Sequence, residues 1–214
     1  MKHILCFGDS NTYGISPEWV HGQFGRHPMD VRWPGRLQAL LGPEYRVIEE
    51  GLSGRTTVFE DFVTPYRNGA SYLRPCLETH APLDLVIIML GTNDCRNQFG
   101  VNPGEIAMGL GRLIQIVKDP AVYMGMPAPK VLVAVPVPMG EDALKLPDGI
   151  TTPESIAKSR ALAPQYRRTA EMYGCDFIDL GKVASVTDYE GIHLDAAAHA
   201  AVAEAMAAKI REIL

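Results

Sequence analysis

Short apolar runs alternate with longer helical patterns along the chain, and this alternation limits the folds that it can adopt. The strongest run, LDLVIIML at Leu83–Leu90, is almost entirely apolar, as expected of a strand that is covered on both faces. Weaker runs predict four further strands: Ile4–Phe7, Tyr45–Ile48, Lys130–Val137 and Phe177–Leu180. Strands that alternate with helices imply βαβ crossovers, so we expect an α/β fold with a mainly parallel sheet.

Helices are predicted where the end signals are clear. They are Trp33–Leu41, which stops at Gly42; Asn102-Pro103, an N-cap followed by proline, to about Lys118; Thr151-x-x-Glu154, which has the spacing of a capping box, to about Tyr173-Gly174; and a final Ala-rich helix from Asp195 to Leu214. The segments 10–30 and 51–71 are predicted as long loops, which in compact proteins are often functional.

Composition places the chain among folded proteins without a basic face. Its 214 residues are 47% apolar and 21% charged, which predicts one globular domain over 1–214. The net charge of −5 argues against nucleic acid and anionic membranes as partners. The longest apolar run falls well short of the ~20 residues that cross a bilayer. The segment before Gly8 is too short for a signal peptide, so we expect a cytoplasmic protein.

Neither a metal nor a disulfide scaffold is predicted. Cys6, Cys76, Cys95 and Cys175 are widely spaced and form no C-x-x-C pair, which disfavours structural zinc and favours reduced thiols. A group of His21, His27 and Asp30 is too loosely spaced to predict a metal site.

Polar and glycine residues follow the predicted strands, at the edge of a parallel sheet where ligands usually bind. The four segments are Gly8-Asp9-Ser10, Gly51-Leu52-Ser53-Gly54, Gly91-Thr92-Asn93-Asp94 and Glu190-Gly191-Ile192-His193. Each alone is more typical of a turn or a solvated loop. Together, and in this order at strand ends, they indicate a site assembled from both ends of the chain.

The residue types at this edge suit acyl transfer. A serine attacks a carbonyl when a histidine removes its proton, and an acid fixes the tautomer of that histidine. We therefore expect Ser10 as nucleophile and His193 as base. Glu190, three residues before His193, is favoured as the acid, and Asp188 is the alternative.

An oxyanion hole is also needed, because charge develops on the carbonyl oxygen during attack. The candidate donors are the backbone N–H groups of Ser10 and Gly54 and the side-chain amide of Asn93. Glycine at position 54 also permits a close backbone approach.

The four blocks together resemble the SGNH hydrolases, also called the GDSL esterase/lipase family. Ser10, Gly54, Asn93 and His193 match the family's four functional residue types in order, and the resemblance covers essentially the whole chain. The stretches IEEGLSGRTT, NGASYL and PLDLVIIMLGTND look closer still to a bacterial branch of arylesterases and acyltransferases. The resemblance implies a three-layer α/β/α, flavodoxin-like fold with a five-stranded parallel sheet, a Ser-His-acid triad and no cofactor.

The sequence departs from the family pattern in three places. Asn11 stands where the family name has leucine, Glu190 where aspartate is usual, and the segment 136–150 is compact beside the loop associated with the arylesterase branch. These departures bear on the pocket, on the triad acid and on a possible subunit contact.

The function predicted is that of a serine esterase for small-molecule, short-chain esters, with acyl transfer to alcohols as a further activity. We expect five residues near the pocket: Asn11, Tyr13, Trp33, Trp19 and Phe24. For Trp33 the alternative is packing in the core. A carbohydrate acetylesterase is the alternative function, and a flavodoxin-like binding module is the non-enzymatic one. Resemblance to the arylesterase branch also implies a homo-oligomer.

Overall fold

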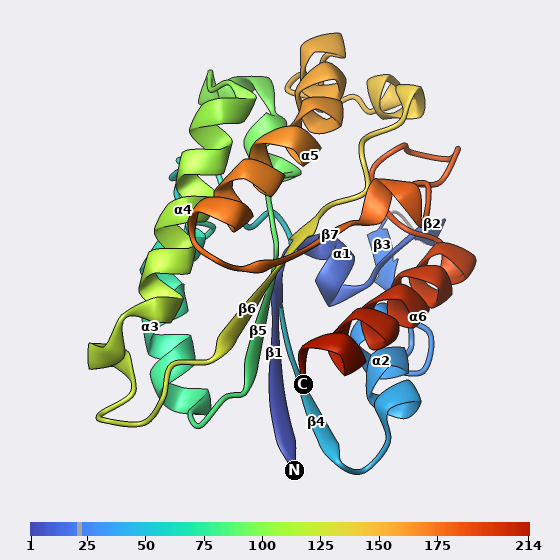
Figure 1. Ribbon diagram of the computed structural model, residues 1–214. Helices are drawn as coiled ribbons and strands as arrows, with labels where there is room; N and C mark the ends of the chain where they lie inside the picture. Colours follow the sequence, from blue (N-terminus) through green and yellow to red (C-terminus); the bar gives the residue numbers. More distant parts are fainter. Residues whose placement is uncertain (21–22) are drawn as a thin grey trace.

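The computed structural model describes residues 1–20 and 23–214, and its main sheet has five strands in which all neighbouring pairs are parallel (Figure 1). The strands are β1 (Lys2–Gly8), β4 (Tyr45–Gly51), β5 (Leu85–Met89), β6 (Lys130–Val135) and β7 (Asp176–Asp179). Their order in the sheet is β4-β1-β5-β6-β7, the flavodoxin-like order in which the second strand of the sheet along the chain lies outside the first. The expected parallel sheet is confirmed.

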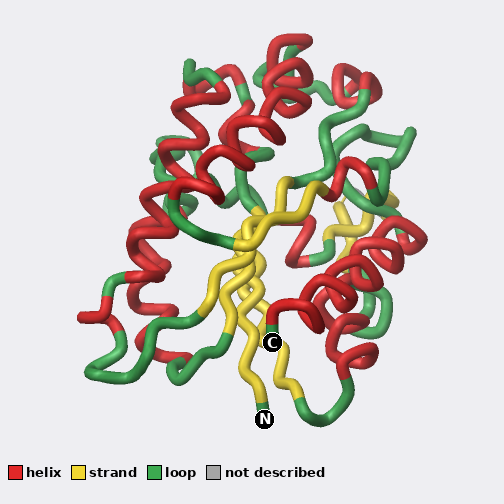
Figure 2. Tube along the Cα trace, viewed as in Figure 1, coloured by secondary structure: helices red, strands yellow, loops and turns green. Residues whose placement is uncertain are grey.

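Helices cover both faces of this sheet. Figure 2 shows the strands lying between two helical layers. The helices α2 (Trp33–Leu41) and α6 (Ala196–Ile213) cover one face, and α3 (Gly69–His80), α4 (Pro103–Lys118) and α5 (Pro153–Met172) cover the other. Alternate residues of β1 point to opposite layers: Ile4 and Cys6 pack with α2 and α6, whereas Leu5 and Phe7 pack with α3 to α5. All of β5 is buried because it lies between both layers.

Strand β4 extends past its predicted end at Ile48 to Gly51. It is an edge strand, paired only with β1, so Glu49 and Glu50 can continue the strand and still reach solvent. The apolar run alone therefore predicts a strand that is too short at its C-terminal end.

The predicted loop 51–71 ends in a helix that the sequence analysis missed. The Asn68 side chain caps α3 by accepting from the backbone N–H of Ala70. Proline within a helix removes a backbone donor, and Pro75 in the interior of α3 hid the helical pattern.

The predicted loop 10–30 is also structured. It contains the single-turn helix α1 (Ser10–Tyr13) and an antiparallel hairpin of β2 (Ile15–Val20) and β3 (Gln23–Arg26). A register shift after Ser16 interrupts the pairing, and Pro17 lies at that point. Because the pairing is irregular, the sequence here lacks the regular alternation of apolar and polar residues by which a strand is predicted.

The predicted caps of α4 and α6 are confirmed, because Asn102 forms a capping box with Glu105 and Asp195 accepts from Ala198. The box of α5 lies one residue later than predicted, between Thr152 and Ser155. The Thr151 hydroxyl instead donates to Asp148, at 2.6 Å.

Short 3₁₀ turns complete the chain: η1 (Asn93–Cys95), η2 (Asn97–Phe99), η3 (Pro120–Val122), η4 (Glu141–Lys145) and η5 (Leu180–Lys182). Among the helices of the described residues, none has the length and apolar character needed to cross a bilayer.

Candidate active site

Three strands of the sheet end at the same level, which brings the segments after them together. Gly8 at the end of β1 pairs with Gly51 on β4 and with Met89 on β5. Residue 51 must be glycine, because a Cβ there would come within 2.1 Å of the backbone nitrogen of Tyr13. The loop after β4 therefore packs directly against α1.

Ser10 is the first residue of α1 and lies almost fully buried at this strand edge. Asp9 caps the turn, since its Oδ1 accepts from the backbone N–H of Asn11 at 3.0 Å. The Ser10 Oγ lies 3.0 Å from Nε2 of His193, a residue from the opposite end of the chain. The structure thus brings together the predicted nucleophile and base.

Glu190 holds the other side of the same imidazole. Its Oε2 lies 2.9 Å from Nδ1 of His193, and its Oε1 accepts from the backbone N–H groups of Ile192 and His193. Burial alone would raise the pKa of the Glu190 carboxyl, but these hydrogen bonds, the ring contact first, hold that pKa below its ordinary value. The carboxylate is therefore ionised at neutral pH. Asp188 is exposed in the preceding turn.

Asn11 fixes the His193 segment to α1. Its Nδ2 donates to the carbonyl oxygen of Ile192 at 3.2 Å, and its Oδ1 accepts from the N–H of Leu194 at 3.1 Å. Both ends of the amide are used and the side chain is buried, so the contacts of Asn11 position the His193 segment, and its place in the pocket stays a prediction. Leucine at this position has no polar group to make these bonds, which gives the departure from G-D-S-L a structural reason.

The aromatic residues predicted near the pocket have different environments. Trp33 is fully buried in the core with α6, so its placement in the pocket is wrong and the alternative, packing in the core, holds. The Tyr13 ring is half-buried beneath the Arg26 guanidinium, 3.9 Å from its centroid. The side chains of Trp19 and Phe24 lie outside the described residues.

The loosely spaced histidines of the first long loop have separate environments. His21 lies outside the described residues, and His27 packs edge-on against His199.

The predicted oxyanion donors follow β4 and β5. Gly54 has φ +81°, a conformation that other residues rarely adopt. A Cβ at Gly54 would meet only the flexible side chain of Arg67, at 3.3 Å, so backbone conformation and not close approach requires glycine. The Asn93 amide, on η1, donates to the carbonyl oxygen of Arg55 at 3.0 Å and has a longer contact of 3.5 Å with Asp9.

Two buried carboxyl groups brace this edge. Burial raises the pKa of both Asp9 and Asp94 to about 6. Asp94 accepts from the backbone N–H of Thr57 at 2.9 Å and from the Thr57 hydroxyl, which ties the loop after Gly54 to η1. The sequence analysis missed Thr57, although its position just after the Gly54 block is the signal that marks it.

Arg55 joins the same loop to β1. Its Nη1 donates to the carbonyl oxygens of Gly8, at 2.9 Å, and of Glu50, and its guanidinium lies over the Phe7 ring. The buried Arg55 guanidinium thus ties the residue after Gly54 to the ends of β1 and β4.

Known proteins resemble this chain over its whole length. The sequence profile of the GDSL-like lipase/acylhydrolase family matches residues 6–201. An aryl esterase from M. smegmatis is 42% identical and superposes with a TM-score of 0.93, and each chain is covered completely. A carbohydrate acetylesterase from Sinorhizobium meliloti is 39% identical, with the same TM-score and complete coverage of both chains.

A curated relative extends the comparison to a longer protein. An acetylxylan esterase from Xylanibacter ruminicola is 28% identical over an alignment that covers 97% of this chain. The chain spans 43% of the length of that relative.

Proposed function

The chain belongs to the GDSL-like lipase/acylhydrolase family, and on this basis we propose that it is a serine esterase that hydrolyses short-chain carboxylic esters through an acyl-enzyme. The observation that carries the proposal is the hydrogen-bonded series from Ser10 Oγ through His193 to Glu190, at 3.0 and 2.9 Å. This is the arrangement that a serine nucleophile requires.

In the proposed reaction, Ser10 Oγ attacks the ester carbonyl carbon while Nε2 of His193 takes the hydroxyl proton. Glu190 keeps the proton on Nδ1 and stabilises the imidazolium. The C–O bond then breaks, and His193 gives its proton to the leaving alcohol. Water attacks the acyl-enzyme by the same route, which releases the carboxylic acid and restores Ser10.

The oxyanion donors proposed are the N–H groups of Ser10 and Gly54 and the amide of Asn93. The 3.0 Å bond to Arg55 orients the Asn93 amide, and its long contact with Asp9 leaves one amide hydrogen weakly engaged. That hydrogen is the one we assign to the oxyanion.

Replacing Asn93 with alanine tests this assignment. We expect kcat for p-nitrophenyl acetate to fall by about 10²–10³-fold with a much smaller change in KM, because the donor acts on charge that develops only in the transition state. Steady-state kinetics measure the effect. A rise in KM with kcat unchanged would contradict the assignment.

Short acyl chains are favoured by the polarity of the site. The buried side chains around Ser10 are polar, as Asp9, Asn11, Thr12 and Asn93 show. Within each of the two core layers, the apolar side chains pack against one another and are largely unexposed. Burial of a long acyl chain needs apolar surface beside the nucleophile.

A chain-length series of p-nitrophenyl esters measures this preference. We expect kcat/KM to be highest for the acetyl or propionyl ester and to fall as the chain lengthens. A maximum at ten carbons or more would contradict a small acyl site.

Carbohydrate acetylesterase is the second candidate function. The relatives from Sinorhizobium meliloti and Xylanibacter ruminicola favour it, and an acetyl group is a short acyl chain whatever alcohol carries it. Acetate release from acetylated xylose, compared with release from phenyl acetate, distinguishes a sugar from an aryl leaving group.

Three further properties belong to the proposal. An alcohol that replaces water at the acyl-enzyme makes the protein an acyltransferase.

Three large apolar residues in one short segment are exposed, which supports a homo-oligomer: Phe62, Val63 and Tyr66. All four cysteines are free, which suits a cytoplasmic location.

A further inference from the structure

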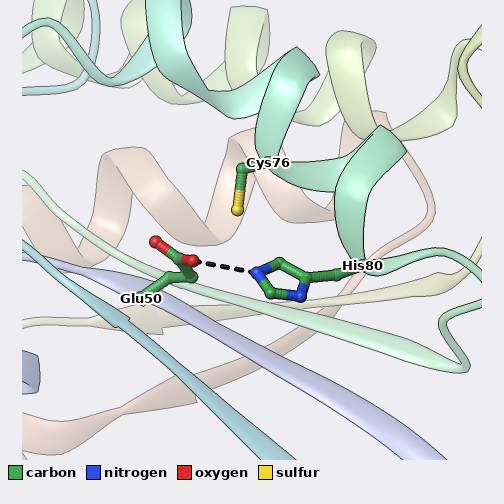
Figure 3. A group of neighbouring side chains, drawn as sticks. All are labelled: Glu50, Cys76 and His80. Atoms are coloured by element: carbon green, nitrogen blue, oxygen red, sulfur yellow. Dashed lines mark hydrogen bonds and ion pairs between the residues drawn. The ribbon is translucent and has the colours of Figure 1, made fainter.

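A second cluster of chemically active side chains lies apart from the Ser10–His193–Glu190 series. Figure 3 shows Glu50 on β4 facing Cys76 and His80 on α3. A carboxylate oxygen, the Sγ and a ring nitrogen all lie within 4.8 Å of one another. Within residues 1–20 and 23–214, this is the one such group of three.

The fold explains why these three residues meet. Cys76 and His80 are four residues apart, so they lie on the same face of α3, which packs against the sheet. Glu50 is the penultimate residue of the edge strand β4 and points to the same side. The Oε1 of Glu50 lies 2.9 Å from Nε2 of His80, and the thiol points toward this pair.

We propose that Glu50, Cys76 and His80 bind a divalent transition-metal ion of the zinc class. One sulfur, one imidazole nitrogen and one carboxylate oxygen are the donor types that zinc accepts, whereas calcium and magnesium prefer oxygen alone. Three protein ligands leave a fourth position for water.

The geometry needs little adjustment to hold such an ion. Bonds of about 2.0–2.3 Å in a tetrahedral arrangement place donor atoms roughly 3.3–3.8 Å apart. The three donor atoms already lie within 4.8 Å of one another, so small side-chain rotations bring them to this separation. The ion replaces the Glu50–His80 hydrogen bond and the thiol proton passes to solvent, so each metal bound releases one proton from Cys76.

Access to the cluster is open from one side. Cys76 is buried, whereas the side chains of Glu50 and His80 are partly exposed. A surface cavity of about 460 Å³ borders the site and is lined in part by Glu50, Tyr66 and Tyr72. An ion can therefore reach the buried thiol past the two outer ligands.

A metal at this place would fasten α3 to the sheet. Glu50 directly precedes Gly51, and its carbonyl oxygen accepts from the Arg55 guanidinium that also binds Gly8. Binding in the folded state alone raises stability. We expect Zn²⁺ to raise Tm without becoming a requirement for ester hydrolysis, since Ser10 and His193 are not ligands.

Cobalt titration of the untagged, reduced protein tests the proposal. We expect one Co²⁺ per chain and a thiolate-to-cobalt charge-transfer absorption. Cys76→Ser should abolish that absorption, and His80→Gln and Glu50→Gln should each weaken Co²⁺ binding by at least about tenfold. Cys175→Ser removes a cysteine outside the cluster and is the matched control, with absorption unchanged.

Two results would overturn the proposal. One is the lack of a charge-transfer absorption in the folded wild-type protein. The other is an absorption or affinity that persists unchanged in His80→Gln. The histidine variant keeps the experiment decisive if Cys76→Ser fails to fold, because His80 lies partly exposed at the end of α3.

Discussion

Replacing Ser10 with alanine is expected to lower kcat for p-nitrophenyl acetate by about 10⁴-fold or more, because the acyl-enzyme cannot form without the hydroxyl. Ser10 is nearly buried, and its Oγ has a hydrogen-bond partner in His193 at 3.0 Å. The loss of one hydroxyl should cost little stability. Initial rates at saturating ester, with Tm measured alongside, separate chemistry from folding.

Ser185→Ala is the matched control, since Ser185 is exposed and lies outside the strand-end segments. It should retain wild-type kcat. Turnover by Ser10→Ala at the wild-type rate would contradict the nucleophile assignment.

Replacing Glu190 with glutamine is expected to lower kcat by about 10³–10⁴-fold. The glutamine oxygen can still accept from the N–H groups of Ile192 and His193, so the loop keeps its shape. Its NH₂ group then faces Nδ1 of His193 and favours the tautomer that carries the proton on Nε2. That tautomer cannot take the proton from Ser10.

Asp188→Asn tests the other acid that the sequence left open. Asp188 is exposed, and Oε2 of Glu190 lies 2.9 Å from Nδ1 of His193. We expect kcat of this variant within about twofold of wild type. A large loss in Asp188→Asn together with a small one in Glu190→Gln would reverse the assignment.

Much of the fold follows from local pattern. The run at Leu83–Leu90 is apolar because β5 lies between two helical layers. A strand of this kind can be predicted from a single sequence. The four segments at the strand ends converge because parallel strands end at one edge. Gly8, Gly51 and Met89 lie at that level.

What the sequence could not show depends on contacts between distant residues. The positioning role of Asn11 depends on Ile192 and Leu194, which belong to the other end of the chain. Trp33 borders a long predicted loop, which favours the pocket, whereas helix α2 directs its side chain into the core. Each residue type alone was compatible with both environments.

The Glu50–Cys76–His80 cluster also depends on contacts between distant residues, so the sequence alone does not reveal it. Cysteine spacing gave no zinc pattern, because one ligand comes from a strand and two from a helix that Pro75 concealed. Only the packing of α3 against β4 places the three donors together.

The most direct test of the account is labelling of the wild-type protein with a fluorophosphonate, followed by mass spectrometry of the intact chain and its peptides. An activated serine should take one adduct per chain, located on Ser10, and Ser10→Ala should remain unlabelled. A folded protein that takes no adduct, or takes it on another residue, would contradict the account and return the flavodoxin-like binding module as the better description.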